Sequence, residues 1–70
     1  MKLRKCLKHQ INSDYVGIAF LGEETEYYKV SELKTDKVIL LNSKVINIHA
    51  EITKLVVSSH EMPIVVYTLE

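Results

Sequence analysis

The chain has 70 residues, of which 47% are hydrophobic and 26% charged, so it forms one small domain, 1–70, and is not disordered. A net formal charge of zero excludes a strong overall attraction to nucleic acid or membranes, and no run approaches the roughly 20 apolar residues of a membrane span. The single cysteine excludes an internal disulfide, and with no recognisable signal peptide we expect a cytoplasmic protein.

The first segment, residues 2–11, allows two interpretations. Leu3, Leu7 and Ile11 recur every four residues among basic side chains, as on one face of an amphipathic helix. All three are also odd-numbered, so an alternating strand stays open. We expect a short helix, followed by a turn over 12–14.

Two strands are predicted next, over 15–21 and 26–30, joined by a hairpin loop over 22–25. Because neighbouring residues of a strand point to opposite faces, Tyr27 and Tyr28 should lie on opposite sides of the sheet. One of them should pack inward, while the other lies nearer solvent or a partner.

The middle of the chain is polar at first and then apolar. Residues 31–36 predict either one helical turn capped by Ser31 or an irregular loop. Residues 37–41 predict a strand, and 42–43 a two-residue turn.

Residues 44–53 carry the clearest strand signal. Apolar residues fall on one side and polar residues on the other: Ile46, Ile48, Ala50 and Ile52 against Asn47, His49, Glu51 and Thr53. After Lys54 the alternation shifts phase, which indicates a β-bulge near Thr53 and Lys54 or the start of a new strand.

A loop over 58–61 leads to Pro63, which can open a last strand over 64–69. Short connections favour antiparallel pairing. The predicted fold class is therefore mainly β: a small antiparallel barrel or two-layer sheet of five to six short strands, with or without a short N-terminal helix. Sm-like and SH3-like barrels share this order of elements, but no sequence motif of either family is present.

Three segments are apolar on both faces: 38–41, 55–57 and 64–66. A 70-residue domain has one core and cannot easily cover both faces of three strands, so we expect a second, identical chain to bury the surplus. The alternative is a bulged barrel in which both faces turn inward at different points.

No residue pattern predicts catalysis or a cofactor. Cys6 and His9 form one C-x-x-H pair, whereas a structural zinc site needs four ligands, so Cys6 is predicted to be a small buried hydrophobe. Ser58, Ser59, His60 and Glu61 are adjacent in one loop, unlike the separated members of a catalytic triad. Glu24 and Glu26 lie on a hairpin predicted to be exposed, which does not desolvate one carboxylate of the pair as acid–base catalysis requires.

The candidate binding residues fall into three groups. The basic residues are Lys2, Arg4, Lys5 and Lys8; the tyrosines are Tyr27 and Tyr28; the polar face of the 44–53 strand presents Asn47, His49 and Glu51. Basic residues contact phosphates and exposed tyrosines stack on bases, so nucleic acid is a possible partner, although the chain lacks the overall basic excess of most such modules.

We therefore expect a non-enzymatic, homo-oligomeric protein that regulates or inhibits another macromolecule, most simply a protein. The Lys- and Ile-rich composition favours a bacterial or phage origin. Two alternatives remain: a small nucleic-acid-binding SH3/Sm-like barrel that uses the N-terminal basic residues, and an oligomeric binder of a nucleotide-like small molecule. No membrane partner is expected.

Overall fold

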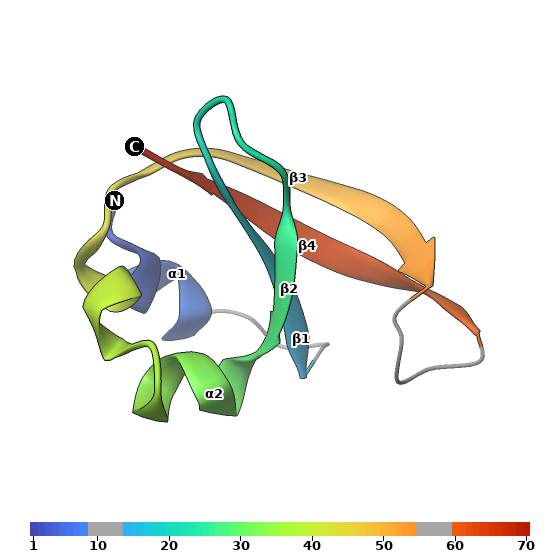
Figure 1. Cartoon of the computed structure of the whole chain (residues 1–70), viewed down its shortest axis with the longest axis horizontal. Coiled ribbons are helices and arrows are strands. Elements are labelled where there is room, and N and C mark those ends of the chain that lie inside the picture. The colour runs from blue at the N-terminus through green and yellow to red at the C-terminus, as the bar shows by residue number, and fades with distance from the viewer. Residues whose placement is uncertain (9–13, 55–59) are drawn as a thin grey trace.

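The computed structural model describes residues 1–8, 14–54 and 60–70. Its elements in chain order are α1 (Leu3–Lys8), β1 (Tyr15–Phe20), β2 (Glu26–Lys29), α2 (Val30–Thr35), the 3₁₀ helix η1 (Val38–Asn42), β3 (Val45–Lys54) and β4 (Glu61–Leu69). The strands form one sheet in the order β2-β1-β4-β3, and the helices gather at one end of it (Figure 1). The mainly β class and the N-terminal helix are thus confirmed.

The sheet is mixed and open, which corrects the predicted antiparallel barrel of five to six strands. β1 pairs antiparallel with β2, and β3 with β4, but β1 pairs parallel with β4, from Val16 opposite Val65 to Phe20 opposite Leu69. The short-connection rule failed here because these two strands are not consecutive. The chain between β1 and β4 forms β2, α2, η1 and β3, and it is long enough for a parallel crossover.

The β1–β2 hairpin forms as predicted. Gly22 adopts a φ of 83°, a backbone conformation that glycine reaches without steric cost, and the Glu23 amide donates to the Phe20 carbonyl at 2.9 Å. Val30, predicted as the end of the second strand, instead begins α2.

One core fills the space between the helices and the covered face of the sheet. The helices contribute Leu3, Cys6, Leu7, Leu33 and Leu41, and the strands contribute Val16, Ile18, Tyr67 and Leu69. Six-residue helices such as α1 and α2 are unstable alone, so this packing is what holds them in place. Cys6 is a buried free thiol in this core, as its sequence context predicted.

Residues 37–41 are not a strand, and 42–43 are not a hairpin turn. The segment forms η1, in which the Leu40 amide donates to the Lys37 carbonyl and the Ser43 amide to the Leu40 carbonyl, both at 3.0 Å. Leu41 is buried with the helices. Because η1 lies among the helices and away from the sheet edges, its backbone groups bond locally, and this overrides the strand preference of its branched side chains (Figure 1).

The polar segment before η1 does contain a helix, but Ser31 is not its cap. α2 begins at Val30 with Lys29 in the N-cap position, and the Lys29 amide donates to Glu32 Oε1 at 3.1 Å. The bond satisfies a backbone donor at the start of the helix.

β4 explains why residues 64–66 are apolar on both faces. It lies between β1 and β3, so its odd-numbered residues face the helices while Ile64 and Val66 form a second buried cluster with Ala19 on the other face. Pro63 sits beyond the end of the β1 pairing, where a missing N–H costs nothing on that side. This apolar surplus is buried within the chain itself.

The bulge predicted near Thr53 and Lys54 is absent, because both residues pair regularly with β4. The irregularity lies instead between Val45 and Asn47. The predicted 12–13 turn, the apolar 55–57 segment and the 58–59 part of the predicted loop fall outside the described residues.

Candidate binding surfaces

The face of the sheet opposite the helices, here called the open face, carries a row of four aligned residues. Tyr27 on β2 is opposite Gly17 on β1, Gly17 is opposite Val66 on β4, and Val66 is opposite His49 on β3. All four residues share one side of the sheet because directly paired residues share a face. The register therefore brings a tyrosine and a histidine from the two edge strands onto one surface.

Gly17 allows Tyr27 to lie flat across β1. A Cβ atom at Gly17 would meet Val66 Cγ2 at 2.8 Å, Thr25 Cγ2 at 3.0 Å and Tyr27 Cε1 at 3.3 Å. A side chain at this position would therefore collide with Val66 and Thr25 and crowd the Tyr27 ring. Val66 is fully buried although no described helix covers this face, and Tyr15 and Met62 pack against the cluster that it forms with Ala19 and Ile64.

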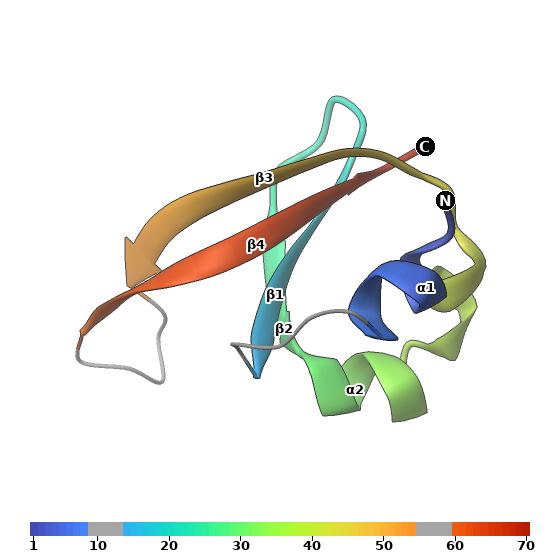
Figure 2. The same ribbon diagram turned by 180° about the vertical axis from the view of Figure 1, so that it is seen from behind.

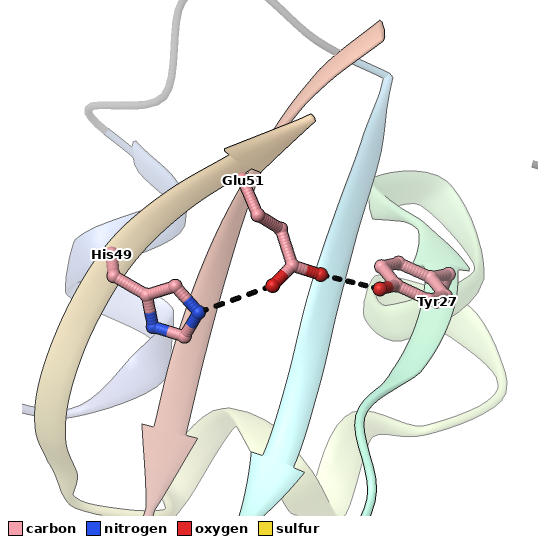
Figure 3. A network of polar contacts seen from close by, with 3 residues as sticks. All are labelled: Tyr27, His49 and Glu51. Carbon is pink, nitrogen blue, oxygen red and sulfur yellow. Dashed lines mark hydrogen bonds and ion pairs between the residues drawn. The ribbon is translucent and has the colours of Figure 1, made fainter. Parts of the chain in front are cut away.

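The Tyr27 hydroxyl points toward β3, and the Glu51 side chain extends from β3 over β4 to meet it (Figure 3). The hydroxyl donates to Glu51 Oε1 at 2.5 Å, while His49 Nε2 lies 3.3 Å from Glu51 Oε2. Figure 3 shows Tyr27 and His49 converging on the Glu51 carboxylate from opposite sides. Two of the predicted β3 residues and one predicted tyrosine therefore form one polar network.

The network shifts two pKa values in opposite directions. The hydrogen bond from Tyr27, supported by His49, lowers the pKa of Glu51 below the usual 4.5, against a smaller opposing effect of burial. The same hydrogen bond, with desolvation and the Glu51 charge, raises the pKa of Tyr27 above 10.0. The arrangement stabilises an ionised glutamate and a neutral tyrosine at neutral pH.

The other two predicted residues of these strands lie differently. Asn47 is exposed on β3 opposite Thr68, on the same face as the network but without a contact to it. Tyr28 is on the helix side, packed against the core, and its hydroxyl donates to Glu26 at 2.5 Å. That bond and burial raise the pKa of Tyr28. The prediction that the two tyrosines take opposite faces is confirmed.

The four predicted basic residues lie close together on the surface. Lys2, Arg4, Lys5 and Lys8 line a cavity of about 500 Å³ beside α1. Arg4 Nη2 lies 3.5 Å from Asn42 Oδ1, and none of the four has an ion-pair partner among the described residues. Their charges are therefore uncompensated by nearby carboxylates in the described part of the chain.

The surface that sequence reasoning misjudged is the apolar side of β3. The alternation indicated an ordinary one-sided strand, and only its polar face was named as a candidate surface, yet Ile46, Ile48 and Ile52 are 42%, 52% and 72% exposed. β3 is the edge strand, and the far halves of β3 and β4 extend past the helices (Figures 1 and 2). The alternation correctly indicated a strand, but only the strand order shows that nothing described covers it.

The described ranges contain neither a metal-binding cluster nor a membrane-spanning helix. No group of three or more His, Cys, Asp or Glu side chains in these ranges is placed to hold a metal ion. Within the same ranges, no helix has the length and apolar character needed to cross a membrane. Comparison of the chain with protein-family models, curated proteins and solved structures gave no match.

Proposed function

We propose that this protein is a small, non-enzymatic, homo-oligomeric binding protein that regulates or inhibits another macromolecule. One observation carries the proposal: an edge strand of ten residues, β3, exposes three isoleucines on the side where a one-sided strand normally buries them. An exposed apolar edge strand is a template for pairing with another chain, and soluble proteins usually protect it.

The location of the apolar surplus differs from the one that the sequence suggested. Residues 64–66 are largely covered by their own chain and do not support oligomerisation. Residues 38–41 form a 3₁₀ helix in which Leu41 is buried while Val38 and Ile39 are 44% and 82% exposed. The 46–52 stretch, which looked like an ordinary one-sided strand, exposes three isoleucines along a sheet edge. The open face then remains available to a macromolecular partner through Tyr27, Asn47 and His49.

Light scattering after size exclusion tests the proposal, at concentrations up to the order of 100 µM to capture a weak complex. We expect a mass that is a multiple of 8.1 kDa. Ile52→Lys should shift the mass toward that of one chain. Ile39→Lys is the matched control, because Ile39 is 82% exposed on η1, and this change should leave the mass unaltered. A single-chain mass for the unaltered protein at every concentration would exclude the proposal.

A second candidate function, binding of single-stranded nucleic acid, is favoured by the basic cavity beside α1. Four cations without carboxylate partners among the described residues suit a phosphate backbone. Binding to single-stranded RNA should weaken steeply with salt. Lys5→Glu with Lys8→Glu should abolish it, whereas Lys34→Glu with Lys37→Glu, which changes the same total charge on α2 and the segment after it, should preserve it. Equal loss in both double variants would reject a specific basic site.

A further inference from the structure

The direction of the β3 backbone groups follows from contacts of β4. The Leu69 carbonyl accepts a hydrogen bond from the Leu21 amide at 3.1 Å, so the backbone groups of Leu69 point toward the β1 side. By alternation, those of Tyr67, Val65 and Pro63 also point away from β3. Pro63 agrees with this assignment, because it has no N–H to give to β3.

The partners of these residues on β3 must then point outward. Tyr67, Val65 and Pro63 are opposite Ile48, Ala50 and Ile52. Where one member of an antiparallel pair bonds away from the ladder, the other does too. The free edge of β3 therefore presents the N–H and C=O groups of these three β3 residues, and no described strand lies along it.

The start of the same edge is already occupied. The Val45 amide donates to the Met1 carbonyl at 2.7 Å, and Lys2 forms an isolated bridge with Lys44. The unpaired part of the edge thus begins after the irregularity between Val45 and Asn47. A pairing partner must fit the stretch from Ile48 onward.

We propose that a second copy of this chain pairs with that stretch, antiparallel and about a two-fold axis at Ala50. The inference rests on the proposed function and names the interface behind it. In this register Ile48 is opposite Ile52 of the second copy, Ala50 is opposite itself, and Ile52 is opposite Ile48. Each of the three pairs exchanges two backbone hydrogen bonds, so all the outward groups of these residues are satisfied.

The side chains favour this register on both faces. On the helix side, the two isoleucines of each copy surround the central pair of alanines, which are small enough to leave room for them. On the open face, His49 lies opposite Glu51 of the second copy and Glu51 opposite its His49. These pairs are of the non-hydrogen-bonded kind, in which side chains approach most closely. No two carboxylates are then opposite each other, and each Glu51 keeps its bonds to Tyr27 and His49 of its own chain.

Neighbouring registers are less favourable. An axis at Glu51 places two carboxylates directly opposite, and an axis at His49 pairs two histidines and leaves Glu51 opposite Asn47; like charges opposite each other destabilise a sheet. An axis at Ile48 requires Lys44, which is already bridged by Lys2. The pairing at Ala50 joins two four-stranded sheets into one continuous sheet, with the described helices of both copies on the same face.

Cysteine cross-linking tests the register. In a Cys6→Ala background, His49→Cys and Glu51→Cys are made in separate chains, mixed and oxidised, and the products are weighed by mass spectrometry. An axis at Ala50 brings residues 49 and 51 of different chains to a Cα separation of about 4.5 Å, which a disulfide can span. We expect the mixed dimer to form about tenfold or more faster than the background given by Ile39→Cys, because pairing raises the effective concentration.

Each other outcome overturns the register in a distinguishable way. A dominant dimer of two His49→Cys chains places the axis at residue 49, and a dominant dimer of two Glu51→Cys chains places it at residue 51. An oligomeric mass with cross-linking no faster than for Ile39→Cys shows that the copies meet through another surface. A single-chain mass rejects the proposed function together with the register. Cysteine-free chains checked by circular dichroism serve as the folding control.

Discussion

Gly17 and Tyr27 depend on each other at the level of single residues. A Cβ on Gly17 would crowd the Tyr27 ring at 3.3 Å, and would meet Val66 and Thr25 still more closely. A glycine inside a strand is normally a weakness, but here an aromatic residue on the neighbouring strand compensates for it.

Gly17→Ala should therefore destabilise the protein and displace Tyr27 from Glu51. The new methyl group meets two side chains at 3.0 Å or less, and overpacking of this kind costs roughly 1–3 kcal/mol. Urea denaturation measures the loss. Gly22→Ala is the contrast: it meets nothing within 4 Å and incurs only the strain of its φ, so it should leave the titration of Tyr27 unchanged. An unaltered Tyr27 titration in Gly17→Ala would show that the ring does not need this space.

The Tyr27–Glu51 bond should make stability depend on pH at both ends of the range. The pKa of Glu51 is lowered on folding, so its contribution is present above about 4.5 and is lost as pH falls through the lowered value. The pKa of Tyr27 is raised, so its contribution is present below 10.0 and is lost as pH rises through the raised value.

Tyr27→Phe removes both effects with little change of shape. In this variant the pKa of Glu51, followed by NMR of its carboxyl carbon, should move up toward 4.5, because the largest cause of its depression is gone. Tyr28→Phe is the matched control, since Tyr28 bonds Glu26 on the other face and should leave Glu51 unaffected. No movement in Tyr27→Phe would contradict the network.

At the scale of the elements, one side of β3 pairs with β4 and the other side is unpaired in the described structure. Proline substitutions distinguish the two sides. The backbone of His49 points to β4, whereas that of Ala50 points outward. His49→Pro removes a ladder hydrogen bond and should unfold more readily than Ala50→Pro, by roughly 1–3 kcal/mol. Ala50→Pro should instead reduce self-association.

Urea denaturation and light scattering give the two readings, and His49→Ala controls for loss of the imidazole. If Ala50→Pro destabilised the monomeric protein more than His49→Pro does, the inferred direction of the backbone groups would be wrong. The comparison needs no knowledge of a macromolecular partner.

The sequence predicted those elements whose own residues determine them. Alternation over 44–53 and the apolar run at 15–21 identified β3 and β1, and the spacing of Leu3 and Leu7 identified α1. Residues 37–41 were mispredicted because their branched side chains favour strands, while their position among the helices leaves no strand to pair with. Propensity is local, but strand pairing is a property of the whole chain.

The candidate site was predictable in the same partial way. The face of β3 that carries His49 and Glu51, and the opposite placement of Tyr27 and Tyr28, follow from the period of two. The convergence of Tyr27 on Glu51 does not, because it depends on the strand order and on the space above Gly17. The grouping of the basic residues followed from their closeness in sequence.

For the molecule as a whole, strand order decides what is buried. β4 lies inside the sheet and is apolar on both faces, whereas β3 carries an equally regular apolar side and lies at the edge with that side exposed. The alternation of apolar and polar residues alone does not determine which of the two strands lies at the centre of the sheet. The strand order therefore determines which apolar surface is left exposed for self-association. The helices cover only the part of the sheet formed by β1 and the C-terminal part of β4 (Figure 2).

The parallel pairing of β1 with β4 also governs when the protein can fold. β1 and its central neighbour β4 are separated in the sequence by the whole chain between Phe20 and Glu61. Until the two strands pair, Val16 and Ile18 have no strand on that side, and contacts this distant in sequence form slowly. Formation of the sheet therefore depends on a pairing between two strands far apart in the sequence, and until it forms the apolar residues of β1 can take part in aggregation.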